Sequence, residues 1–159
     1  MKDEPGPRWL REILHEQVPL SRAMGLDVTR LDVDGIELTA PLQLNHNHAG
    51  TAFAGSLYAI AALAGWGYLR YRVAAAGLDA HLVLADGSIR YPRPYEGNLR
   101  CVLEADAGEV ADALERVAGG RRARLDLTTH LPDPETPAAV FTGRFAALPQ
   151  RPQEAQRHA

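Results

Sequence analysis

A polar loop that runs into a long apolar segment holds the residues best suited to chemistry. Residues 45–50 contain two asparagines and two histidines, and the apolar segment begins with the small residues Ala54, Gly55 and Ser56. The start of a helix leaves its first N–H groups unpaired and carries a partial positive charge, so it attracts an anion. The pattern therefore favours chemistry on a carbonyl whose oxygen becomes negative. A structural alternative stays open, in which Thr51 or Ser56 caps the helix and the asparagines hold a turn.

Composition sets the broad class of protein. A chain of 159 residues with a net charge of -3 predicts one domain with a real core, and this charge argues against a nucleic-acid partner. The single cysteine, Cys101, excludes an internal disulfide, and the N-terminus lacks a signal-peptide pattern, so we expect the cytoplasm. Residues 52–69 carry no charge and are long enough to cross a bilayer, but their alanines, glycines and tyrosines favour a buried helix and no membrane partner.

The periodicity of apolar residues predicts the elements that position this loop. We expect helices over 7–17, 54–76 and 110–117 and strands over 26–31, 36–40, 81–91, 99–105, 123–131 and 139–147. Asp34-Gly35 predicts a hairpin with positive φ, and Pro19 and Gly77 each end a helix.

A long helix that is apolar on all sides needs a sheet curled around it, which is an α+β architecture. Glycine is unfavourable within a helix, so Gly65 and Gly67 indicate strands passing close by. Residues 1–148 are expected to form one domain, and the polar residues 149–159 a disordered tail.

Two segments resemble a known superfamily. The pattern Asn47-x-x-Gly50-x-x-Phe53-Ala54-Gly55 resembles the Asn-x-x-Gly-x-x-His-Gly-Gly motif of the hotdog-fold thioesterases. The stretch 86–94 resembles the third strand of that superfamily, which commonly ends in an aromatic residue, a variable pair and a proline. Residues 51–57 followed by 64–66 are most similar to the thioesterase domain found as the C-terminal half of bacterial GNAT acetyltransferase fusions. The resemblance covers residues 18–148 and implies an antiparallel sheet wrapped around one long helix.

The resemblance also implies an activity and an assembly. Acyl-CoA or acyl-carrier-protein thioesters would be the substrates, and the site would lie at the boundary of a homodimer whose sheets join edge to edge. Pairing of dimers into tetramers stays open. Asn47 matches the asparagine of the motif, and Ala54 and Gly55 match its two glycines, so the Gly55 N–H would face the thioester carbonyl. No spacing of metal ligands and no nucleotide-binding fingerprint occurs, so we expect neither a metal nor a cofactor.

The chain departs from the family pattern at the residues that usually do the chemistry. Phe53 replaces the motif histidine, and Ala62 stands where many members carry the catalytic acid of the helix. Other side chains must then activate water, and the candidates are Asn47, His48, Ser56 and Asp86, with His46 a weaker one. Each also has a structural explanation, as a turn residue, a surface histidine, a helix cap or a solvated carboxylate.

Substrate binding has its own candidates. Ala54 and Gly55 would offer backbone groups, Phe53 and Tyr58 would line an acyl pocket, and Arg90 and Arg93 would receive phosphates of CoA or pantetheine. The aromatics could equally belong to the core, and the arginines to a solvated face.

The sequence thus predicts an acyl thioesterase, with two alternatives. One is a non-catalytic module that binds acyl thioesters. The other is a hotdog dehydratase or hydratase acting on 3-hydroxyacyl thioesters, which would need His48 beside Asp86.

Overall fold

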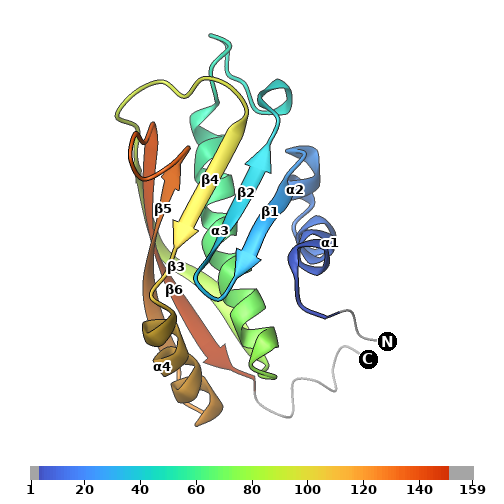
Figure 1. The fold of residues 1–159 in the computed structure, drawn as a ribbon, viewed down its shortest axis with the longest axis vertical. Helices are drawn as coiled ribbons and strands as arrows, with labels where there is room; N and C mark the ends of the chain where they lie inside the picture. The colour runs from blue at the N-terminus through green and yellow to red at the C-terminus, as the bar shows by residue number, and fades with distance from the viewer. Residues whose placement is uncertain (1–3, 151–159) are drawn as a thin grey trace.

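A computed structural model describes residues 4–150 of the chain (Figure 1). Its elements are α1 (Pro7–Gln17), α2 (Pro19–Ala23), β1 (Asp27–Asp32), β2 (Gly35–Ala40), η1 (Leu42–Leu44), α3 (Ala54–Ala75), β3 (Ala80–Arg90), β4 (Leu99–Glu104), α4 (Ala107–Ala118), β5 (Ala123–Leu131) and β6 (Ala139–Pro149). All predicted helices and strands are present, with small shifts at their ends. The short helix α2 was not predicted, because Pro19 begins a helix rather than only ending one, as its fixed φ allows at a first helical position.

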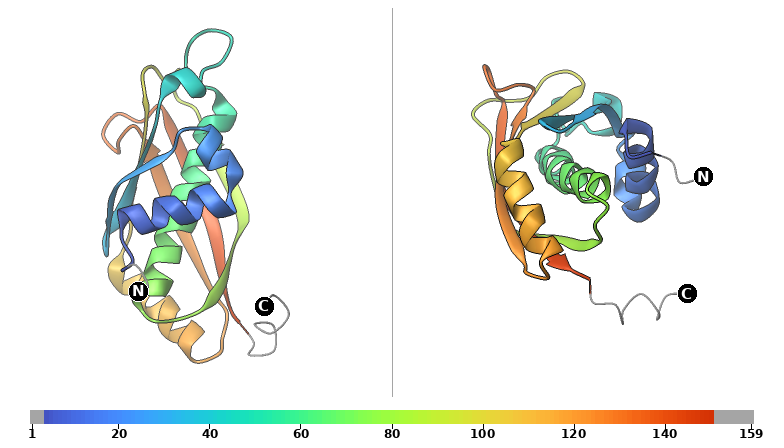
Figure 2. Two further views of the ribbon diagram at one scale, coloured as in Figure 1. Left: turned by 90° about the vertical axis from the view of Figure 1, so that its right-hand side faces the viewer. Right: turned by 60° about the horizontal axis from the view of Figure 1, so that its bottom comes forward.

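The sheet wraps around the long helix as expected. Its six strands are antiparallel, in the order β1-β2-β4-β5-β6-β3, and the 22-residue helix α3 runs along its inner face. In Figure 2, α1 and α2 cover the side of α3 that the sheet leaves open. Strands β1 and β3 form the two edges. The α+β prediction of a sheet around one central helix is confirmed.

The two helical glycines have different neighbours. A Cβ on Gly65 would lie 2.3 Å from a ring carbon of Phe145 in β6, so only glycine lets the strand pass this close. A Cβ on Gly67 would instead lie 3.2 Å from Leu10 in α1. The expected close strand is therefore found at Gly65, whereas at Gly67 the nearest neighbour is helix α1, with Ile36 of strand β2 at 3.7 Å.

The hairpin between β1 and β2 turns at Val33 and Asp34, one residue before the predicted Asp34-Gly35, and Gly35 already begins β2. Gly35 is not among the glycines with positive φ. A Cβ there would lie 2.1 Å from the carbonyl oxygen of Leu103 in β4, so glycine permits close approach of the neighbouring strand. The Asp32 side chain holds the turn, since its Oδ1 accepts from the N–H groups of Asp34 and Gly35 at 2.9 and 3.0 Å.

A buried polar cluster ties this hairpin to the second half of α3. The Tyr68 hydroxyl and the Arg72 guanidinium both donate to the Val33 carbonyl at 2.8 Å, and Arg72 donates to the Tyr68 oxygen at 2.7 Å. Tyr68 and Arg72 are both buried. The cluster gives these polar groups partners inside the core.

The predictions for the chain ends and the apolar segment have mixed outcomes. Strand β6 continues to Pro149, so the proposed tail does not begin at residue 149, and residues 151–159 lie outside the described part. Within residues 4–150, no helix combines the length and apolar character required to cross a membrane. Cys101 is fully buried on the apolar face of β4, as its alternation predicts.

Candidate active site

The loop that leads into α3 is anchored by a buried asparagine. Asn45 donates through Nδ2 to the carbonyls of Met24 at 2.9 Å and Pro41 at 2.8 Å. Its own carbonyl accepts from the Phe53 N–H at 2.8 Å. Asn45 therefore closes the loop by joining its two ends to each other and to the segment before β1. Sequence reasoning placed it in the polar loop without giving it a role.

Asn47 shapes the tip of the same loop. Its Oδ1 accepts from the N–H groups of Ala49 at 2.8 Å and Thr51 at 3.2 Å, and its Nδ2 donates to the Thr51 hydroxyl at 2.8 Å. Gly50 has a φ of +78°, which favours glycine. The alternative in which this asparagine holds a turn is thus supported, and it is compatible with a site role because Asn47 also lines a pocket.

The first backbone N–H groups of α3 have no side-chain acceptor among residues 4–150. Phe53 is the N-cap residue, and in the described part of the chain no side chain makes a capping hydrogen bond there. The alternative in which Thr51 or Ser56 caps the helix is therefore wrong. A Cβ on Gly55 would lie 2.4 Å from a ring carbon of Phe53, so the ring that replaces the motif histidine packs over the helix start. The partial positive charge of a 22-residue helix is concentrated at these N–H groups.

A pocket of about 390 Å³ lies between the start of α3 and the segment that follows β3. Its lining residues are Asn47, Thr51, Ala52, Ala54, Leu57, Tyr91, Pro92, Arg93, Pro94 and Tyr95. Figure 1 shows the loops before α3 and before β4 at the same end of the molecule. The fold thus brings together three predicted site residues, Asn47, Ala54 and Arg93.

Two tyrosines of this pocket were not among the predicted site residues. The Tyr91 hydroxyl donates to the Ala54 carbonyl at 2.9 Å. The Tyr95 carbonyl accepts from the Ala52 N–H at 2.9 Å, and its hydroxyl accepts from the Arg100 N–H at 2.8 Å. Burial raises the pKa of both phenols, so they stay protonated at neutral pH. The aromatic at the end of the 86–94 stretch was the available signal for Tyr91.

Several predicted catalytic side chains lie away from the pocket lining. His48 is exposed and, among residues 4–150, has no hydrogen-bond partner, while His46 bonds through Nδ1 to the Asn47 carbonyl at 2.9 Å. Ser56 is half-buried and is not part of the lining. Helical periodicity puts its side chain on the side of α3 opposite Ala54.

Asp86 and Arg90 point away from α3. Asp86 is exposed and pairs in register with Arg144 of β6, whose guanidinium bonds to Asp126 on the outer face of the sheet. Gly87 next to it faces inward, since a Cβ there would lie 2.4 Å from the Tyr58 hydroxyl. Alternation along the strand then puts Arg90 on the outer face with Asp86. The juxtaposition of His48 and Asp86 that a dehydratase would need is not formed within the chain.

Tyr58 lies between α3 and the sheet. Its ring meets that of Phe141 edge to face, with centroids 5.1 Å apart. Phe141 is fully buried and Tyr58 partly exposed, so this pair joins the core to the region near the start of α3.

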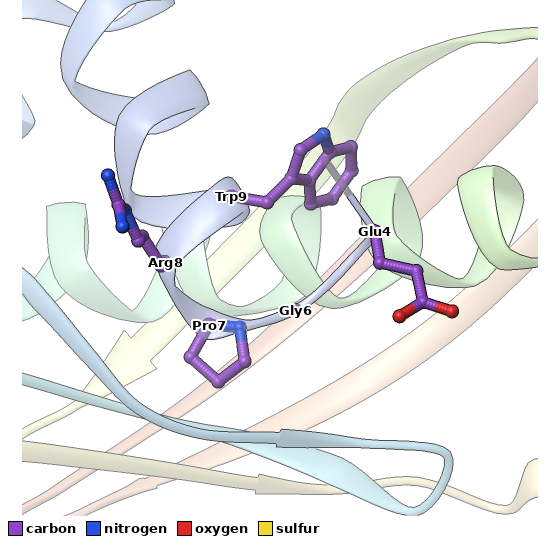
Figure 3. Close-up of a pocket in the computed structure, with 5 residues that line it drawn as sticks. All are labelled: Glu4, Gly6, Pro7, Arg8 and Trp9. Carbon is purple, nitrogen blue, oxygen red and sulfur yellow. The ribbon is translucent and has the colours of Figure 1, made fainter. Parts of the chain in front are cut away.

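A second hollow lies at the other end of the fold. It has a volume of about 290 Å³ and is lined by Glu4, Gly6, Pro7, Arg8 and Trp9 at the start of α1 (Figure 3). It contains none of the predicted site residues. In the described part of the chain, no three His, Cys, Asp or Glu side chains come together as metal ligands would.

Comparison with known proteins identifies the family. The family model described as "Putative thioesterase (yiiD_Cterm)" matches residues 8–149. The chain belongs to this family. The match spans the loop, α3 and the whole sheet, so the pocket described above is part of the family domain.

Solved structures agree with this family assignment. A protein of unknown function from Chlorobaculum tepidum is 30% identical, with a TM-score of 0.85, over 92% of this chain and 99% of that one. A protein from Shewanella oneidensis described as a "putative thioesterase" is 27% identical, with a TM-score of 0.77, over 94% of this chain and all of that one. A Pseudomonas aeruginosa protein described as a probable thioesterase shares the fold, with 20% identity over 90% and 95% of the chains and a TM-score of 0.75. The chain is therefore a thioesterase-like protein with the hotdog fold.

Proposed function

We propose that this yiiD_Cterm family member hydrolyses acyl thioesters of CoA or an acyl carrier protein at the start of α3. The observation that carries the proposal is the uncapped N-terminus of α3 beside the pocket lined by Asn47, Tyr91 and Arg93. The thioester carbonyl would point at the helix start, where the N–H groups of Gly55 and Ser56 donate to its oxygen.

The reaction needs stabilisation of a negative oxygen more than it needs any one side chain. Water attacks the carbonyl carbon, the carbonyl oxygen becomes an oxyanion, and collapse of the intermediate breaks the C–S bond to give an acid and a thiol. Loss of one preorganised oxyanion donor typically lowers the rate by about 10²–10³. Asn47, which lines the pocket, would orient the attacking water. His48 is exposed outside the lining and is left out of this scheme. Asp86 has no part in this scheme, because it points to the outer face of the sheet.

The same proposal includes an assembly and a compartment. Strand β3 pairs with β6 on one side, and within residues 4–150 its other edge is unpaired over 11 residues. A long unpaired edge favours pairing with another strand, here β3 of a second copy in a homodimer.

Arg93 would hold a substrate phosphate, since its guanidinium has donors beyond the one bonded to the Thr136 carbonyl. A cytoplasmic location would supply CoA and carrier-protein thioesters.

One observation favours a second candidate function. Helix α3 contains no carboxylate, and no histidine, aspartate or glutamate of the described residues 4–150 lines the pocket. A module that binds acyl thioesters without cleaving them would need neither an acid nor a base. It would use the same pocket and the same helix start.

The decisive experiment measures thiol release, with a disulfide chromogen, from short, medium, long and aromatic acyl-CoAs and the same acyl groups on a carrier protein. Asn47→Ala should lower turnover about 10-fold or more, because the side chain both shapes the loop and lines the pocket. Asn98→Ala is the matched control: its Oδ1 also holds a loop, accepting from the Leu42 N–H at 3.0 Å, but it does not line the pocket. It should leave turnover near the wild-type value.

The outcomes separate the two functions. Turnover that falls in Asn47→Ala but not in Asn98→Ala supports hydrolysis at this pocket. No turnover with any substrate, together with a higher melting temperature in acyl-CoA, supports the binding module. Neither turnover nor binding would refute both.

A further inference from the structure

The end of β3 is joined to the start of α3 by one side chain that sequence reasoning had not singled out. Tyr91 follows β3 directly, and alternation from the inward-facing Gly87 through Ile89 turns its side chain toward α3. Its hydroxyl donates to the Ala54 carbonyl at 2.9 Å, and its ring lines the pocket. Ala54 is the first residue of the helix.

The bonded carbonyl belongs to the same peptide group as the proposed oxyanion donor. The Ala54 carbonyl and the Gly55 N–H are the two ends of one planar unit, and they point in opposite directions. A hydrogen bond accepted by the carbonyl fixes the plane of the peptide. It also withdraws electron density from the nitrogen, so the N–H becomes a stronger donor.

The bond is not needed to satisfy a buried group. The first carbonyl of an α-helix already accepts from the N–H four residues further on. Tyr91 itself is 44% exposed, so water could replace Ala54 as its partner at little cost. The hydroxyl is therefore suited to orienting the Ala54–Gly55 peptide more than to stabilising the fold.

We propose that Tyr91 is a positioning residue of the thioesterase reaction, whose hydroxyl orients and polarises the Ala54–Gly55 peptide toward the oxyanion. The inference rests on the proposed function, because it takes the Gly55 N–H as the donor. The hydroxyl of Tyr91 does not contact the substrate in this scheme. It acts on the reacting carbonyl through the Ala54–Gly55 peptide, and the ring of Tyr91 lines the pocket.

Tyr91→Phe tests this role, because it removes the hydroxyl and keeps the ring that lines the pocket. We expect kcat to fall about 10-fold with KM changed less than about twofold, since the lost interaction forms in the transition state. The melting temperature should stay within a few degrees of wild type. Tyr71→Phe, a half-buried tyrosine in the second half of α3, is the matched control and should retain full kcat.

A second measurement reports on the peptide directly. An acyl-CoA analogue with a methylene in place of the thioester sulfur and a ¹³C-labelled ketone cannot be hydrolysed, and its carbonyl band is resolved by infrared difference spectroscopy. In the wild type, the bound ketone should absorb at a lower frequency than in water. In Tyr91→Phe the band should move back toward the solution position, which a purely structural role would not cause.

The results distinguish failure of this inference from failure of the function. Equal kcat and an unmoved band in Tyr91→Phe, with an active wild type, would overturn the role of Tyr91 alone. A raised KM at unchanged kcat would also overturn it, by making Tyr91 only a wall of the pocket. A wild type that binds the ketone without hydrolysing thioesters removes the catalytic function, and overturns Tyr91 as a positioning residue of that reaction. A wild type that neither hydrolyses thioesters nor binds the ketone overturns both.

Discussion

The two ends of α3 differ in whether their polar groups find hydrogen-bond partners within the chain. In the second half of the helix, Tyr68 and Arg72 are buried, and both bond to the Val33 carbonyl. At the first turn, among residues 4–150, no side chain caps the backbone N–H groups and the Tyr58 hydroxyl has no hydrogen-bond partner. One end is closed by bonds within the chain, and the other lies beside the pocket.

The physical reason for this difference is burial. A polar group removed from water without a partner costs about 1–3 kcal/mol, so a buried end must supply its own bonds. An end beside a pocket can leave donors to water until a ligand replaces it. The comparison predicts that changes in the second half of α3 lower stability, whereas changes at its start lower activity with little loss of stability.

Breaking the closed end should have the largest effect. Arg72→Met removes the guanidinium that bonds to Val33 and Tyr68, and should lower the free energy of unfolding by about 2–4 kcal/mol, measured by urea denaturation. Arg70→Met is the matched control, since Arg70 is half-buried and contacts the Trp9 ring at 5.2 Å. It should cost less than about 1 kcal/mol. Equal losses of unfolding free energy in both variants would contradict a stabilising role for the hydrogen bonds of Arg72 to Val33 and Tyr68.

Substitutions at Gly65 and Gly67 test how closely the neighbouring elements pack on the middle of α3. Gly65→Ala places a Cβ against the Phe145 ring and should lower the free energy of unfolding by about 1–3 kcal/mol. Gly67→Ala meets the tip of the flexible Leu10 side chain at 3.2 Å and Ile36 at 3.7 Å, and gains helix propensity, so it should be neutral or slightly stabilising. A stabilising Gly65→Ala would mean that Phe145 moves aside easily.

Two tyrosine-to-phenylalanine variants compare the two ends directly. Tyr68→Phe removes a hydroxyl bonded to Val33 and Arg72, and should cost about 1–2 kcal/mol of unfolding free energy. Tyr58→Phe removes a hydroxyl without a partner in the described chain and should change stability by less than about 0.5 kcal/mol. Denaturation curves of the two proteins in one buffer measure the difference. A larger loss in Tyr58→Phe would show that the first turn is closed as well.

Sequence patterns predicted the fold well because periodicity and packing agree. The strand 123–131 alternates cleanly, and its apolar set, from Ala123 to Leu131, is buried. The apolar surface on all sides of α3 could be buried only by elements around it, and the sheet and α1 provide this cover. The helix α2 was missed because a proline that ends one helix can also begin the next.

The site was predicted only in part, because side-chain direction depends on details that spacing does not carry. The motif loop and the helix start are where the pattern places them, and the pocket joins Asn47 to Arg93. Asp86 was a catalytic candidate because it lies on the strand that passes the site, but the register shift between Leu84 and Asp86 changes which residues of β3 point inward and leaves Asp86 on the outer face. Tyr91 needed the three-dimensional contact with Ala54 to acquire a role.

The smallest predicted effect concerns how close to the start of α3 the buried part of the helix begins. The Cys101 sulfur lies 3.8 Å from the Ile60 carbonyl, less than two turns from the start of α3. Burial raises the pKa of this thiol well above its ordinary value of 9.0, so the folded protein keeps it neutral. A disulfide chromogen should therefore find no reactive thiol in the native protein at pH 8, and one after unfolding in urea.

The pH dependence of stability follows from the same thiol. Above pH 9 the unfolded chain loses the thiol proton while the folded chain keeps it, so the free energy of unfolding should fall with rising pH. Cys101→Ala should lack this contribution, and the difference between the two curves isolates it. Rapid labelling of native Cys101 at pH 8 would show that water reaches Ile60, and the open end of α3 would then extend past the first turn into the core.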